Sequence, residues 1–131
     1  MVGDMMDYLY NLDLNDSEIL DMVKLNDHIA QMSSEEVITY IYILVDVGCT
    51  QKQIHDIITA NPFYFSRDDI DVRKFLRRLM AFDDIDVPEV LEGNPWLLNK
   101  DAFEIDDYLE ENRDKGLSDK EILENFIFNC I

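Results

Sequence analysis

The sequence is poor in cysteine, glycine, proline and histidine, and each shortage excludes a class of protein. Its 131 residues include 2 cysteines, 4 glycines and 3 prolines. Cys49 and Cys130 form no CxxC pair, so a disulfide framework or a zinc ribbon is not indicated. The isolated glycines exclude a glycine-rich phosphate loop. Scarce glycine and proline also disfavour an all-β fold, which needs many turns.

Long apolar runs are missing as well. The longest uncharged apolar run is the segment 37–45, far short of the roughly 20 residues of a membrane helix. The segment 1–10 carries two aspartates and no base, and so lacks the basic region of a signal peptide. With no thiol framework, we expect a protein of the reducing cytoplasm that does not associate with membranes.

No motif supports catalysis, a cofactor or a metal ion. His28 and His55, the 2 histidines, have no other ligand-type residue at a spacing that stands out from the acidic background. The aspartates of 83–86 lack the glycine and the terminal glutamate of a calcium loop. We therefore expect no enzyme, and no catalytic, cofactor-binding or metal-binding residues.

Basic residues are few, and the chain is strongly acidic. It holds 29 acids and 11 bases, a formal net charge of −18. Such a surface repels phosphates and anionic membranes and attracts basic surfaces. A hydrophobic content of 47% nevertheless excludes a disordered chain. The acidity therefore has two interpretations: attraction of a basic partner, or solubility alone.

The residues that are present predict helices throughout. Capping boxes, in which a small polar residue precedes Glu or Gln by three positions, occur at Ser33, Thr50, Asp86 and Ser118. Ser66 and Asn99 are expected to be N-caps, and Gly48 and Gly116 to follow helix ends. Apolar residues recur between these signals at the helical period. The predicted helices cover residues 4–12, 16–30, 34–47, 51–60, 67–82, 87–93, 100–115 and 119–129.

An internal repeat of about 33–34 residues organises these helices. Segments 57–65 and 90–98 match at an offset of 33 and share an Asn-Pro pair. Segments 48–54 and 116–122 match at an offset of 68, about two repeats. Each unit is a short helix, a break that the proline imposes, and a longer helix. The first unit has Asp27-His28-Ile29 where the others have Asn-Pro.

The predicted fold is all-α, a right-handed-type αα solenoid of about 3–3.5 helix-pair repeats in one domain. Residues 1–47 form a degenerate N-terminal cap and first repeat, 48–83 and 84–116 the regular repeats, and 117–131 a C-terminal capping helix. The aromatic residues after the prolines, Phe63, Phe65 and Trp96, are expected in the core rather than as a platform for stacking bases.

The repeat resembles that of the mitochondrial transcription termination factor family, in which Gly-Leu-Ser-x-x-x-Ile precedes Pro-x-Leu-Leu and a long helix. The matching pieces are 48–54 with 61–65, 87–91 with 94–98, and 116–122. The resemblance covers about residues 48–126. It implies a curved helical array that holds nucleic acid along a basic concave face. This chain departs from the family in its acidity, which argues against direct binding of nucleic acid.

Charge differs sharply between repeats. Residues 48–82 hold six bases and four acids, whereas residues 83–114 hold twelve acids and two bases. Four bases lie close together, namely Arg73, Lys74, Arg77 and Arg78. Shifted by 33 positions, they fall on Asp106, Asp107, Glu110 and Glu111. Two interpretations remain open: salt bridges between stacked repeats, which would set register more than stability, or a bipolar surface with one strip for each of two partners.

The helix expected at 34–47 is apolar almost all round, which indicates burial on every side. The N-terminal helix could cover it through Met5, Met6, Leu9 and Leu12. A homodimer or a partner protein is the alternative.

We predict a non-enzymatic protein-binding module. Its acidic surface would engage a basic, nucleic-acid-binding protein, and in the sharpest version would imitate nucleic acid as small inhibitors from phages and mobile elements do. The residues of this acidic face are Asp83, Asp84, Asp86, Glu89, Glu92, Asp106, Asp107, Glu110 and Glu111. The alternative is a nucleic-acid-binding transcription regulator that uses a basic strip of Arg67, Arg73, Lys74, Arg77 and Arg78.

Overall fold

A computed structural model describes residues 11–129, and every regular element in this part of the chain is helical. The predicted all-α class is therefore confirmed. The helices are α2 (Asp16–Leu25), η1 (Asp27–Gln31), α3 (Ser34–Asp46), α4 (Gln51–Ala60), η2 (Pro62–Ser66), α5 (Asp69–Met80), α6 (Val87–Gly93), η3 (Pro95–Asn99), α7 (Ala102–Glu111), η4 (Arg113–Lys115) and α8 (Asp119–Asn129), where η marks a 3-10 helix. The helix expected at 4–12 lies almost wholly outside the described residues.

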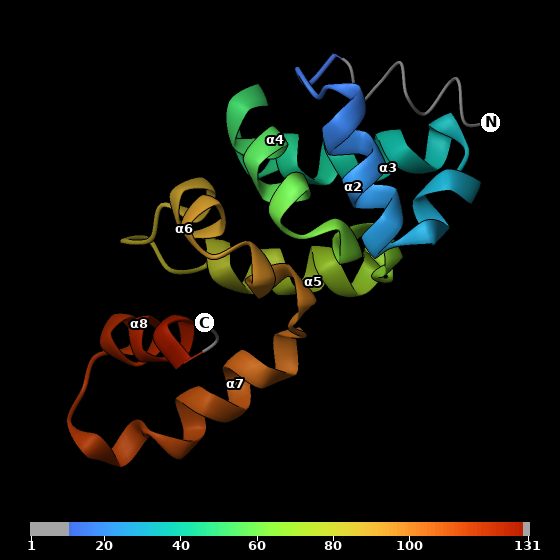
Figure 1. Ribbon diagram of the computed structural model, residues 1–131. Helices are drawn as coiled ribbons and strands as arrows, with labels where there is room; N and C mark the ends of the chain where they lie inside the picture. The colour runs from blue at the N-terminus through green and yellow to red at the C-terminus, as the bar shows by residue number, and fades with distance from the viewer. Residues whose placement is uncertain (1–10, 130–131) are drawn as a thin grey trace.

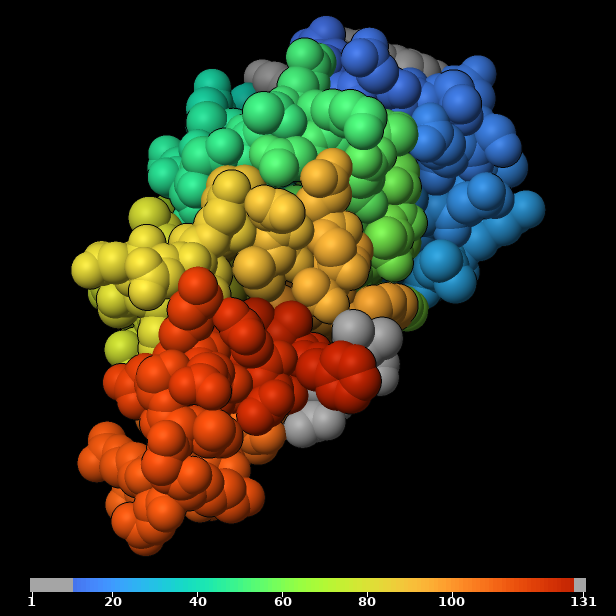
Figure 2. Space-filling model, turned by 90° about the vertical axis from the view of Figure 1, so that its left-hand side faces the viewer, coloured from blue at the N-terminus to red at the C-terminus, as the bar shows by residue number. Residues whose placement is uncertain are grey.

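The helices form successive units of one design. Each unit is an α-helix, a five-residue 3-10 helix and a second α-helix, as in α2–η1–α3, α4–η2–α5 and α6–η3–α7. α8 opens a fourth unit. Figure 1 shows the units following one another from α2 in blue to α8 in red, and Figure 2 shows the same succession along one side of the molecule.

Capping residues begin the helices where the sequence places them. Ser33 and Thr50 form reciprocal capping boxes with Glu36 and Gln53. Ser118 and Glu121 exchange the same pair of hydrogen bonds, at 3.1 and 3.2 Å. At Asp86 the carboxylate accepts from the backbone N–H of the third helical residue. These bonds satisfy N–H groups that the first turn leaves without partners.

Two predictions of helix starts were wrong by two residues. Ser66 and Asn99 do not cap α5 and α7, because each is the last residue of a 3-10 helix. The caps are Asp68 and Asp101 instead. The long helices thus begin two residues later than expected, after a five-residue 3-10 helix that the prediction had left outside the helices.

The helix predicted at 16–30 is also broken, since α2 ends at Leu25. Asn26 follows with φ −141° and ψ 90°, close to the values at Asn61 (−134°, 74°) and Asn94 (−141°, 66°). The first unit therefore keeps the asparagine of the repeat and lacks only the proline. All three units thus end their first helix at a non-helical asparagine, and the first unit does so without a proline after it.

These asparagines connect consecutive units. Asn26 donates its side-chain N–H groups to the carbonyl oxygen of Pro62 at 3.0 Å and to the Ser66 hydroxyl at 2.7 Å. Asn61 donates in the same way to the carbonyl of Pro95 at 2.9 Å and to the side-chain oxygen of Asn99 at 3.2 Å. Asn94, in the third unit, bonds back to Val90 of its own helix. The buried amides thus fix how each unit sits on the next.

One core runs through the units, and its largest fully buried side chains include Tyr64, Phe65 and Phe75. The apolar helix α3 is not buried on every side, contrary to prediction. Val37 and Leu44 are buried, but Tyr42 is 55% exposed and Val45 is 44% exposed. Leu12 is buried, while Met5, Met6 and Leu9 of the proposed cover lie outside the described residues. The homodimer through this helix remains a prediction.

Candidate interaction surfaces

A strip of three basic side chains lies on the outer side of α5. Arg73, Lys74 and Arg77 are exposed and fall within about a third of the helix circumference, at 100° per residue. Arg73 contacts Asp69 one turn earlier, with 3.8 Å between Nε and Oδ2. Lys74 and Arg77 form no ion pair with any of residues 11–129. Lys74 and Arg77 are therefore unpaired within this range, and Arg73 has only a long, exposed contact with Asp69.

The other two bases of the predicted strip hold the repeats together. Arg67 is half-buried and donates to the carbonyl oxygens of Leu98 and Lys100, both at 3.1 Å, and to the carboxylate of Asp101. Arg78 donates to Asp106, with Nε 2.9 Å from Oδ1. Salt bridging between repeats is thus confirmed for Arg78. Its partner is not the equivalent residue Glu111 but Asp106, five positions earlier, so the end of α5 contacts the middle of α7.

The predicted acidic residues divide between two places. Asp83, Asp84, Asp86, Glu89 and Glu92 lie on α6 and the segment before it, and Asp106, Asp107, Glu110 and Glu111 lie on α7. All are exposed except Glu92, which is half-buried. Among residues 11–129, only Asp106 of this set pairs with a base. The rest keep carboxylates that no cation neutralises within the described chain.

A groove of about 460 Å³ separates α6 from α8. Its lining consists of Asp84, Ile85, Asp86, Glu89, Val90, Asn94, Lys120, Glu124 and Ile127. Three residues of the predicted acidic face therefore belong to it. Lys120 and Glu124 were missed, because only the packing of α8 brings them here and no pattern in the sequence indicates it. The gold surface of α6 and the red surface of α8 both face the viewer in Figure 2.

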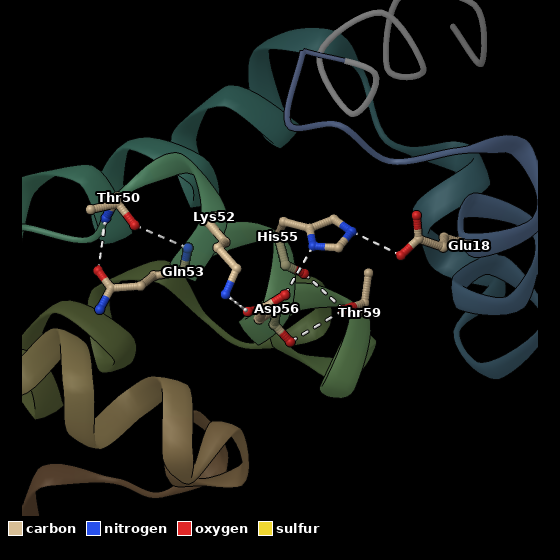
Figure 3. Close-up of polar contacts among 7 residues, drawn as sticks. All are labelled: Glu18, Thr50, Lys52, Gln53, His55, Asp56 and Thr59. Carbon is tan, nitrogen blue, oxygen red and sulfur yellow. Dashed lines mark hydrogen bonds and ion pairs between the residues drawn. The ribbon is translucent and has the colours of Figure 1, made fainter.

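A polar contact between the first and second units centres on His55 (Figure 3). Its Nε2 lies 2.8 Å from Oε2 of Glu18 on α2, and its Nδ1 lies 3.0 Å from Oδ1 of Asp56. Partial burial opposes protonation, but the hydrogen bonds to Asp56 and Glu18 outweigh it and raise the pKa of His55. The sequence shows His55 beside Asp56, but it gives no sign of Glu18, 37 positions earlier.

The aromatic residues after the prolines are not all in the core. Phe65 is buried as predicted, but Phe63 is 41% exposed and Trp96 is 48% exposed. Their ring centroids lie 6.1 Å apart. The two occupy equivalent positions, as the second residues of η2 and η3, and both side chains are exposed.

Neither a cluster of metal ligands nor a membrane-spanning helix is present along residues 11–129. No group of three or more His, Cys, Asp or Glu side chains in that range is arranged to hold a metal ion. None of the helices described is long and apolar enough to cross a membrane.

Fold and surface together define a helical-repeat protein whose units are stacked through buried asparagines and whose charge is separated along the array. The chain belongs to the mTERF family, since the model of that family matches residues 1–130. This is the family that the proline-break repeats resemble. No curated protein matches the chain.

Proposed function

We propose that this protein is a non-enzymatic nucleic-acid-binding factor and that Arg73, Lys74 and Arg77 contact the phosphates. The observation that carries the proposal is a family match over residues 1–130 in a chain whose α5 keeps three exposed bases. Two of them, Lys74 and Arg77, have no acidic partner within residues 11–129. Arg67 and Arg78 serve the stacking of repeats and are left out of the binding strip.

The net charge of −18 limits how such a strip can bind. Long-range repulsion from the acidic units slows encounter, while the strip attracts phosphates only within about a Debye length, roughly 10 Å at 0.1 M salt. We therefore expect a short footprint and modest affinity. Each phosphate contact adds about −0.9 to the slope of log K against log salt for duplex DNA, so a small slope is expected.

Fluorescence anisotropy with labelled single-stranded and duplex DNA and RNA, over a series of salt concentrations, tests this proposal. Arg77→Glu should weaken binding about tenfold or more and reduce the salt slope by about 1. Arg113→Glu is the matched control, because Arg113 is also exposed and its replacement changes the net charge equally. Equal losses in both variants, or no binding to any of the four nucleic acids near physiological salt, would contradict the proposal.

A second candidate function rests on the acidic residues. Eight of the nine predicted carboxylates have no basic partner within the described residues, so the surface around α6 and α7 offers dense negative charge. We infer that this surface binds a basic protein, with fast and salt-sensitive association. Two more specific versions of this function are that the surface imitates nucleic acid and that the protein acts as an inhibitor. Pull-down at low salt with lysine- or arginine-rich bait proteins, and loss of capture with Glu89→Lys, test it.

A further inference from the structure

The stack of first helices is interrupted after α6. α4 packs along α6, and α8 is the equivalent helix of the next unit, with Ser118 at its N-cap where α6 has Asp86. α8 instead packs on α7 and makes little close contact with α6. Figure 1 shows α8 lying alongside α7. The groove of about 460 Å³ occupies the place where α6 and α8 would otherwise meet.

The groove has an apolar part formed by Ile85, Val90 and Ile127. All three side chains are half-buried and pack against the core, so they present a fixed apolar surface to the groove. Burial of this surface by a ligand would remove apolar area from water, which is favourable. An unoccupied face between two helices of a stacked array is thus suited to an apolar side chain of a partner.

Charge surrounds this apolar part and selects the partner. Asp84, Asp86 and Glu89 line the α6 side, while Glu124 and Lys120 line the α8 side. Four carboxylates and one ammonium amount to a formal charge of −3. None of the five forms an ion pair with another of residues 11–129. A ligand must bring positive charge to complement them.

We propose that the α6–α8 groove binds a basic amphipathic segment of a partner protein, which places a large apolar side chain against Ile85, Val90 and Ile127 and arginine or lysine side chains against the four carboxylates. This proposal rests on the second candidate function and specifies its site. Nucleic acid is disfavoured because the groove repels phosphate. A second copy of the chain is disfavoured because it also carries a charge of −18.

The test measures binding of three fluorescent peptides to the whole chain by anisotropy. The first is a short leucine–arginine peptide whose leucines share one helical face. The second has the same composition in scrambled order, and the third is an oligo-arginine with equal charge. The first should bind at least about tenfold more tightly than the other two, because they lack an apolar face that fits the groove.

Paired charge reversals locate the site. Glu89→Lys with Glu124→Lys changes the groove, whereas Glu110→Lys with Glu111→Lys makes the same change in net charge on α7. The groove variant should weaken the amphipathic peptide about tenfold or more, and the α7 variant about twofold or less. Circular dichroism checks that the variants fold. If the groove variant does not fold, Glu89→Gln with Glu124→Gln replaces it, against Glu110→Gln with Glu111→Gln.

The groove is excluded as the site if both double variants weaken the amphipathic peptide equally, if the scrambled peptide binds as tightly, or if the wild-type chain forms a dimer that the groove variant abolishes. If all three peptides bind and both double variants weaken them equally, the acidic surface still binds basic proteins, and only the groove is rejected as the site. Failure of all three peptides to bind would remove both.

Discussion

Asn26 donates to the carbonyl oxygen of Pro62, 36 residues later, and Asn61 donates to the equivalent carbonyl of Pro95. All three units place an asparagine at the end of their first helix, and in the first two it reaches the 3-10 turn of the next unit. Buried amides lose their partners if the units slip, and an unpaired polar group is costly in the interior. The bonds therefore specify the register in which apolar surfaces stack.

Replacement of Asn61 by alanine should destabilise the protein by about 1–3 kcal/mol, because the Pro95 carbonyl loses its buried donor. The side chain of Asn61 is fully buried. Asn94→Ala is the matched control at the equivalent position, since its amide bonds only within α6, and a smaller loss is expected. Urea unfolding followed by circular dichroism measures both, and equal losses would show that the connection between units contributes nothing.

The two arginines that join the second unit to the third should differ in the strength of their contacts. Arg67 is half-buried and holds two carbonyls and a carboxylate, so Arg67→Ala should cost about 2 kcal/mol or more. Arg78 forms an exposed pair with Asp106, so Arg78→Ala should cost at most about 1 kcal/mol and lose its effect at high salt. Unfolding free energies at low and high salt decide whether this order holds.

Stability should depend on pH through His55. Folding raises the pKa of His55 above the usual 6.5. Its contribution to the stability of the fold is therefore complete below pH 6.5 and is lost as the pH rises through the raised pKa. The backbone N–H of Asn15 lowers the pKa of Glu18. At Asp56, burial opposes ionisation, but the hydrogen bond from His55 outweighs it and lowers the pKa. These two carboxylates stabilise the fold fully at pH values above their usual pKa values of 4.5 and 3.8. This stabilisation is lost as the pH falls through their lowered pKa values.

The contact is therefore strongest between about pH 4.5 and 6.5. The difference in unfolding free energy between the wild type and His55→Gln should shrink from about pH 5.5 to about pH 8.5. The exposed His28 provides a control, as His28→Gln removes a histidine from outside this contact. A His55→Gln difference that stays constant over this range would contradict the role of His55.

Cys49 should react slowly in the native protein. Burial, together with the nearby carboxylates of Glu92 and Asp86, raises the pKa of its thiol from 9.0 to about 11. At pH 8 the reactive thiolate is then about a hundredfold scarcer than for an ordinary cysteine. Iodoacetamide labelling of the Cys130→Ser variant, with and without denaturant, reports Cys49 alone. Equal labelling rates in the two conditions would contradict its burial.

Local signals predicted most of the helices because they depend on neighbouring residues only. The boxes at Ser33 and Thr50 and the prolines at 62 and 95 act within one turn of chain, and their effects were confirmed. Ser66 and Asn99 were misassigned as helix caps because their partners are the asparagines of the preceding unit. A residue whose role lies in another unit looks, in sequence, like an ordinary cap.

The candidate surfaces were predicted less well, because charge in sequence does not show which charges are neutralised. Five bases appeared equivalent, yet the fold assigns Arg67 and Arg78 to the joints between units and leaves Lys74 and Arg77 free within the described chain. The acidic face appeared as one set, yet α8 makes a groove of part of it.

The sequence by itself determined the helical class, the repeat, the family and the excess of negative charge, since these follow from short-range periodicity, capping chemistry and composition. The tertiary structure alone decided which amides connect units, which bases are exposed and where α8 leaves α6 uncovered. These properties depend on distances between side chains roughly 30 or more positions apart, and such distances are set by how the units stack.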